Sequence, residues 1–203
     1  MTKKLIACCI LIFSLLPFNT AFAQDVSDNG ISKTELADSL KKNTNLSQEQ
    51  IDGLISVLQK QFDVKPDERI PIEGYLYSSG MNGALFVDHD IWNFDATMKV
   101  PGSQELVTIH DLYSCDFHNG GLKFEIAYKW MFTFIPRGVT VDQLDGAVYG
   151  RGIGIVADAL LGLEGSWMPA KNRNHDLFHA AIKVGIGGGF VFPKMEFKLR
   201  PIK

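Results

Sequence analysis

One stretch of the chain alternates strictly between large apolar side chains and mainly polar ones. In residues 122–134 every even position is Leu, Phe, Ile, Tyr or Trp, whereas Lys123, Glu125 and Lys129 lie at odd positions. Successive side chains of a β-strand point to opposite faces, so this pattern predicts a long strand with one aromatic face. We expect that face to be mostly buried core, with a hydrophobic pocket at its end.

The aromatic face also supplies candidate contacts for a ligand. Phe124, Tyr128 and Trp130 share its parity. A hydrophobic pocket lined by such rings would bind an apolar molecule. We therefore take these three side chains as candidate ligand-binding residues.

Similar β patterns fill most of the chain after residue 64. Turn residues such as Pro101-Gly102 and Asn119-Gly120-Gly121 separate them, and short turns between many strands favour an antiparallel sheet. The segment "VTVDQLDG" could instead hold a short helix. Strands are predicted near residues 70–78, 84–92, 94–100, 105–115, 122–135, 147–157, 159–168, 177–192 and 194–200.

Two helices are predicted before the strands, within residues 24–63. Ser32 with Glu35, and Ser47 with Gln50, each have the spacing of a capping box. The second helix carries an apolar stripe from Ile51 to Leu58 that must be buried. The predicted fold class is α+β and mostly antiparallel β. In it, a helical hairpin packs on a small β-barrel or sandwich formed by residues 64–203, as one folding unit.

Two later strands carry glycine at every second position. The glycines are Gly150, Gly152 and Gly154 in one strand and Gly185, Gly187 and Gly189 in the other. Glycine weakens a strand, so three on one face indicate sharp curvature or the close approach of a helix or a ligand. We expect the helix to lie across one such face. If a ligand approaches instead, Gly152 and Gly187 are candidate contacts.

The glycine strands also carry a family resemblance. The segments "LDGAVYGRGIGI" and "IKVGIGGGFVFPKMEFKLRP" resemble the C-terminal part of small exported bacterial proteins of the envelope-integrity and SYLF lipid-binding type. The resemblance covers roughly the last sixty residues. It implies a compact β structure beside N-terminal helices and a hydrophobic partner, and it transfers no site residues.

The N-terminus predicts export. Lys3 and Lys4 precede an apolar run and the sequence "AFA" before Gln24, which is the pattern of a cleaved secretory signal peptide over residues 1–23. Without it, 18 basic and 23 acidic residues remain, for a formal charge of −5, which argues against nucleic acid as a partner. Cys115 becomes the single cysteine and is expected to be buried.

The histidines offer limited chemistry. His175 and His179 are four residues apart, and a third metal ligand could be Asp88, Asp116 or His118, but no recognised spacing identifies it. Cys115 and His118 have opposite strand parity, which disfavours a catalytic pair. We predict no catalytic residue, no metal site and no cofactor.

These features predict a periplasmic or secreted, non-enzymatic envelope protein. It would bind a hydrophobic or envelope-derived ligand or a partner protein, and it could form a homo-oligomer. Two alternatives stay open. One is a small outer-membrane β-barrel, against which residues 105–115 argue, because neither of their faces is cleanly apolar. The other is a secreted hydrolase that uses His and Asp residues.

Overall fold

The computed structural model of the protein describes residues 30–60, 63–85, 88–150 and 152–203. The predicted signal peptide, residues 1–23, lies outside the described residues. The elements, in chain order, are α2 (Lys33–Asn43), α3 (Gln48–Lys60), the 3₁₀-helix η1 (Pro66–Glu68), β1 (Ile72–Leu85), β2 (Asp88–Lys99), β3 (Leu106–Phe134), α4 (Val141–Leu144), β4 (Val148–Gly150), β5 (Ile153–Met168) and β6 (Leu177–Leu199).

Both predicted helices begin at the expected caps. The Ser32 hydroxyl accepts a hydrogen bond from the backbone N–H of Glu35. Ser47 and Gln50 form the reciprocal pair of a capping box: the Ser47 hydroxyl accepts from the Gln50 N–H, and the Gln50 side chain accepts from the Ser47 N–H. The apolar stripe of α3 is buried, as predicted. The short helix predicted within "VTVDQLDG" is α4.

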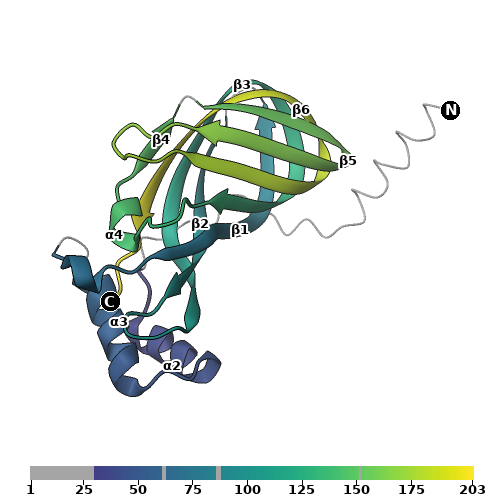
Figure 1. The fold of residues 1–203 in the computed structure, drawn as a ribbon. Helices are drawn as coiled ribbons and strands as arrows, with labels where there is room; N and C mark the ends of the chain where they lie inside the picture. Colours follow the sequence, from purple (N-terminus) through teal and green to yellow (C-terminus); the bar gives the residue numbers. More distant parts are fainter. Residues whose placement is uncertain (1–29, 61–62, 86–87, 151) are drawn as a thin grey trace.

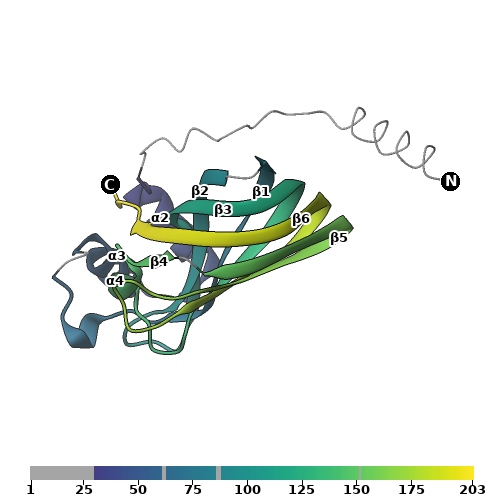
Figure 2. The same cartoon turned by 90° about the horizontal axis from the view of Figure 1, so that it is seen from above.

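The strands form one antiparallel sheet of six strands that curls into a half-barrel (Figure 1). The pairing order is β1-β2-β3-β6-β4, with β5 also paired to β6 and β1 also paired to β3. Seen from above, β3, β6 and β5 run side by side, and β1 and β2 lie on the far side of β3 (Figure 2). The antiparallel prediction is therefore confirmed.

Strands β3 and β6 are much longer than predicted. Their pairing runs without interruption from Tyr113 opposite Leu199 to Phe134 opposite Phe178. The sequence suggested a turn at Gly120-Gly121, but here the chain continues in register. Gly121 has φ of +146°, and a Cβ there would meet the backbone of Phe190. The glycines accommodate a bend of the strand rather than a reversal.

The inward side of β3 changes its chemistry along the strand. Tyr113, Cys115 and Phe117 are buried in an apolar core. Further along the same parity, Lys123 and Glu125 are also buried. The predicted orientation of residues 122–134 was therefore wrong: the Lys and Glu side chains point inward, and the aromatic row points outward. Alternation gives a strand two faces but does not tell which face is buried.

The glycines predicted to face a helix pack closely against neighbouring strands instead. A Cβ at Gly152 would contact the backbone of Trp167 and Met168, and one at Gly185 would contact Ile126 and Ala127. The expected docking of α3 across a glycine face is therefore not observed at these positions. Strand curvature, the other geometric reading, accounts for the close contacts. Gly152 itself lies between β4 and β5 rather than within a strand.

Candidate functional site

The most unusual surface of the protein is formed by the outward side chains of β1, β3, β5 and β6, here called the apolar face. Its large exposed members are Tyr75, Met81, Leu85, Leu122, Phe124, Ile126, Tyr128, Phe134, Ile153, Ile155, Leu161, Leu163, Trp167, Phe178, Ile182, Val184, Ile186, Phe190 and Phe192. An aromatic side chain carries about 150–250 Å² and these residues are about half exposed, so the apolar face presents on the order of 1,500 Å². The largest apolar patch on a typical monomer is about 300–600 Å².

The apolar face is organised in rows that the strand register sets. Tyr75 pairs with Phe134, Phe134 with Phe178, and Phe178 with Trp167, so four aromatic side chains form one row across four strands. In the rows beyond it the outward side chains of β3 stay mainly aromatic, whereas those of β5 and the middle of β6 are aliphatic. Leu163 lies opposite Ile182, Leu161 opposite Val184, and Ile126 opposite Ile186. Phe190 pairs with Leu122 and Ile155 near the far end.

The outward positions of these segments are free of charge. In residues 75–85, 122–134, 153–157, 159–167 and 178–192, no outward-facing position is Asp, Glu, Lys or Arg. The outward positions on the other parts of β3 and β6 are mostly polar, among them Thr108, Asp116, Glu196 and Lys198, with Leu106 as an exposed exception. The molecule therefore has one apolar side and one polar side.

A network of ion pairs lies behind the apolar face. Glu125 Oε2 is 2.7 Å from Lys183 Nζ, and Glu125 Oε1 is 2.5 Å from Lys129 Nζ. Glu164 Oε2 is 3.2 Å from Lys129 Nζ and 3.6 Å from Lys183 Nζ. Lys123 Nζ is 3.7 Å from Glu125 Oε2. All five side chains are at most 3% exposed, and we call them the ionic cluster.

Electrostatics within this interior are strongly perturbed. Burial raises the pKa of the Glu164 carboxyl, but the positive charges of Lys129, Lys123, His179 and Lys183 outweigh it and lower the pKa to about 2. Burial lowers the pKa of His179 to about 4, against the opposing effect of Glu164. His179 is therefore neutral near pH 7, and its Nδ1 lies 3.1 Å from the Thr133 hydroxyl.

The five predicted ligand-binding residues are not gathered around one cavity. Phe124 and Tyr128 lie on the apolar face, and Trp130 is only half-buried beside Tyr128. Gly187 lies in β6 opposite Glu125. Gly152 is separated from these along the chain and lies against Trp167.

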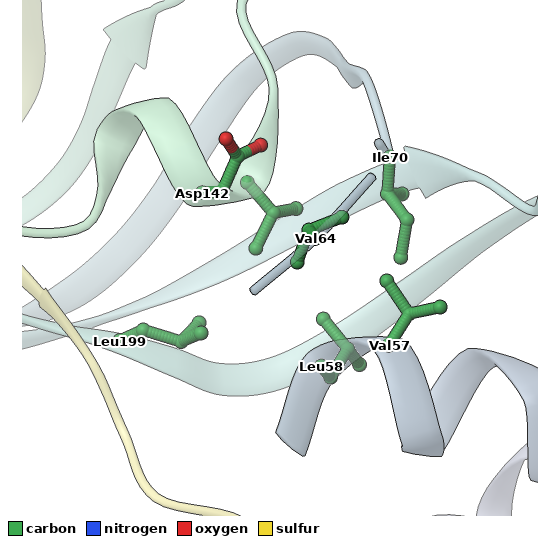
Figure 3. Close-up of a pocket in the computed structure, with 7 residues that line it drawn as sticks. Val57, Leu58, Val64, Ile70, Asp142 and Leu199 are labelled. Atoms are coloured by element: carbon green, nitrogen blue, oxygen red, sulfur yellow. The ribbon is translucent and has the colours of Figure 1, made fainter. Parts of the chain in front are cut away.

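Two cavities in the described structure lie elsewhere. One, of about 10 Å³, is lined by side chains of α3, α4 and the end of β6, among them Leu58, Val141 and Leu199 (Figure 3). The other, of about 350 Å³, is an open groove between α3 and residues 68 and 100–101. Neither cavity includes a residue of the apolar face, so the pocket expected at the end of the aromatic row is not found in either.

The remaining candidates for chemistry are dispersed. Cys115 is a buried free thiol, as predicted, and burial raises its pKa well above the ordinary value, which makes it a poor nucleophile. His175 Nε2 lies 2.8 Å from the Tyr149 hydroxyl, and His110 Nδ1 lies 2.9 Å from Asp95 Oδ2. The pair His175 and His179, considered from the sequence, points to two different partners.

One group of histidines does converge. His89, Asp116 and His118 place one potential ligand atom each within 4.8 Å of one another on the polar side of the sheet. Sequence reasoning named Asp116 and His118 as possible ligands but did not connect them with His89. Their connection depends on strand register, which local spacing does not give.

No described helix is long and apolar enough to cross a membrane. Comparison of the chain with known protein families, curated proteins and solved structures found no match.

Proposed function

We propose that this protein is an exported, non-enzymatic envelope protein that binds membrane lipid through the apolar face. The observation that supports this most directly is the apolar face, whose described outward side chains on four paired strands carry no charge. Left in water, a patch of this size would drive association, so it needs an apolar partner. Acyl chains are apolar partners that an envelope provides in excess.

The shape of the surface favours a lipid layer over a single small ligand. Small-molecule sites are concave and enclose most of the ligand. The apolar face is instead the outer side of a curled sheet, and from Leu122 to Phe134 it extends about 40 Å along β3 at about 3.3 Å per residue. Many acyl chains together can cover such a surface.

The row order supports the same partner. Aromatic side chains are favoured where a membrane changes from hydrocarbon to head groups, whereas aliphatic side chains suit the hydrocarbon itself. The row of Tyr75, Phe134, Phe178 and Trp167 would lie at that boundary, and the aliphatic side chains of β5 and β6, from Ile182 to Ile186 on β6, would lie in the hydrocarbon.

We place the protein on the membrane rather than through it. The outward positions of the other strand halves include Asp116, Glu196 and Lys198. A lysine facing lipid at the bilayer midplane costs about 2–4 kcal/mol. An arrangement with only the apolar face in hydrocarbon leaves these charges in water. The six described strands also form an open half-barrel, and its edge strands would leave unpaired backbone groups in hydrocarbon if the sheet spanned the bilayer like the outer-membrane barrel considered from the sequence.

The N-terminal helices complete the proposal as a support for the sheet. Ile51, Leu54, Ile55 and Leu58 belong to the same hydrophobic cluster as residues of β2, β3 and β6. Gln59 Nε2 donates a hydrogen bond to the carbonyl of Ile202 at 3.2 Å. We infer that the helical hairpin packs on the end of the sheet away from the apolar face. Mature protein recovered from its host should begin at Gln24, which N-terminal sequencing would establish.

Flotation with uncharged phosphatidylcholine vesicles tests the proposal. Wild-type protein should float with the vesicles. Ile182→Glu and Leu163→Glu, which place a carboxylate on neighbouring aliphatic positions, should reduce the bound fraction at least tenfold. Thr108→Glu, on the polar side of β3, is the matched control and should bind like the wild type. Circular dichroism confirms that each variant is folded.

Two results would contradict lipid binding. In the first, the wild type stays in the aqueous fraction at every lipid concentration. In the second, light scattering shows a stable dimer or larger assembly that both Glu variants dissociate, and the assembly does not bind vesicles. That result would assign the apolar face to a second copy of this chain.

A further inference from the structure

The polar side of the sheet holds a compact group of nitrogen and oxygen donors. His89 Nε2 lies 2.9 Å from Asp116 Oδ1, and His118 Nε2 lies 3.0 Å from the same oxygen. The two imidazole rings are stacked, with centroids 4.0 Å apart and planes 6° from parallel. Both rings therefore place the same nitrogen within 3.0 Å of one carboxylate oxygen.

Strand pairing fixes this arrangement. His89 in β2 lies directly opposite His118 in β3, and Asp116 is two residues from His118, on the same face of the strand. All three positions lie within paired strands rather than in loops, so the backbone holds the donor atoms near their observed separation. Side chains of 35–55% exposure leave the group open to ions from solution.

We propose that His89, Asp116 and His118 form a binding site for a divalent transition metal ion, with Zn²⁺ as the best fit. Tetrahedral Zn²⁺ with bonds of 2.0–2.1 Å separates its ligand atoms by about 3.3 Å. The two nitrogen–oxygen separations of 2.9 and 3.0 Å need to open by only a few tenths of an ångström, and the two imidazole nitrogens lie within 4.8 Å of each other. Because the rings are stacked nearly parallel, one of them must also tilt so that both nitrogens point at the ion.

The donor set also selects the class of ion. Imidazole nitrogens suit Zn²⁺, Cu²⁺ and Ni²⁺, whereas Mg²⁺ and Ca²⁺ prefer sites made of oxygen ligands only. Three protein ligands leave a fourth position for water or for a ligand from solution. Glu196 and Lys194 lie in β6 opposite Asp116 and His118, so one charge of each sign flanks the site.

Isothermal titration of the tag-free mature protein with Zn²⁺ tests this site. One Zn²⁺ should bind per chain, and His89→Ala or His118→Ala should each raise the Kd at least tenfold. His110→Ala is the matched control, because His110 also contacts an aspartate at 2.9 Å on the same sheet but has no second histidine. This variant should bind Zn²⁺ as the wild type does.

A spectroscopic readout distinguishes ligation from a structural effect. With Cu²⁺ in place of Zn²⁺, electron paramagnetic resonance should show two coupled imidazole nitrogens in the wild type and one in His89→Ala. Unchanged Zn²⁺ affinity in both His89→Ala and His118→Ala, or equal affinity for Mg²⁺, would overturn the proposal. These readouts do not depend on lipid binding, so this proposal can fail or succeed independently of the proposed function.

Discussion

Within the ionic cluster, neutralising Glu125 should lower the free energy of unfolding the most. Its carboxylate is fully buried and lies within 4 Å of three lysine ammonium groups, on Lys123, Lys129 and Lys183. At an effective dielectric constant of about 20, two charges 2.7 Å apart attract by about 6 kcal/mol, and the cost of removing them from water offsets part of this. Breaking a buried ion pair from one side typically costs about 3–5 kcal/mol.

We therefore expect Glu125→Gln to lower the free energy of unfolding by about 3–5 kcal/mol, since it keeps the shape and leaves the ammonium groups with one fewer carboxylate. Guanidinium unfolding followed by circular dichroism, in the same mild detergent for every variant, measures this. Glu196→Gln is the control. Glu196 pairs with Lys198 at 3.4 Å on the surface, where an ion pair contributes about 0–1 kcal/mol.

A double-mutant cycle sharpens the test. Lys183→Met alone should also destabilise, but the double variant Glu125→Gln, Lys183→Met should lose clearly less than the sum of the two single losses, because the partners are in direct contact. Losses that simply add, or equal losses for Glu125→Gln and Glu196→Gln, would refute the buried cluster and with it the inward orientation of this strand face.

Three further outcomes follow from other parts of the interior. Between pH 6.5 and about 4 the unfolded chain binds a proton at His179 that the native protein does not, so the free energy of unfolding should fall by about 3 kcal/mol as the pH falls through this range. In denaturant titrations at several pH values, His179→Gln should remove this loss. If the loss persists in the variant, the ring is not buried as described. Gly121→Ala should lower the melting temperature, because a side chain at this backbone conformation is strained by about 1–3 kcal/mol. Gly120 has open space around it, so Gly120→Ala should change the melting temperature little. Equal changes in the melting temperature of the two variants would argue against the bend at Gly121. Cys115 should react with a thiol reagent only after denaturant is added, and fast labelling of the native protein would place it at the surface instead.

The local elements were predictable because their signals are local. The caps at Ser32 and Ser47 depend on residues three positions apart, and the structure shows the complete capping box at Ser47 and the hydroxyl cap at Ser32. The alternation in residues 122–134 likewise identified a strand. Its orientation was not predictable by the same rule, because an apolar outer face around a polar interior has the same period as the reverse. The signal that could have identified it is the series Lys123, Glu125 and Lys129, which places opposite charges on one face.

The histidine group shows a second limit. Near the turn that joins β2 to β3, Ala96 lies opposite Ile109, and extending that register would place His89 opposite Asp116. An irregularity between Phe94 and Ala96 shifts the pairing by two residues, so that His89 lies opposite His118. Such irregularities arise from long-range packing, and a single sequence does not locate them.

β6 follows every strand it pairs with in the sequence, and this order has a consequence for how the protein is made. β6 pairs with β3, β4 and β5, so the sheet lacks its central strand until residues 177–199 are available. Contacts between β3 and β6 join residues up to 86 positions apart, as in the pair Tyr113 and Leu199, and long-range pairing of this kind slows folding. A chain that emerges from its N-terminus first would hold the side chains of the apolar face unassembled until β6 has been made or translocated. Folding in the cell should therefore depend on a chaperone that shields these strands until the last one arrives.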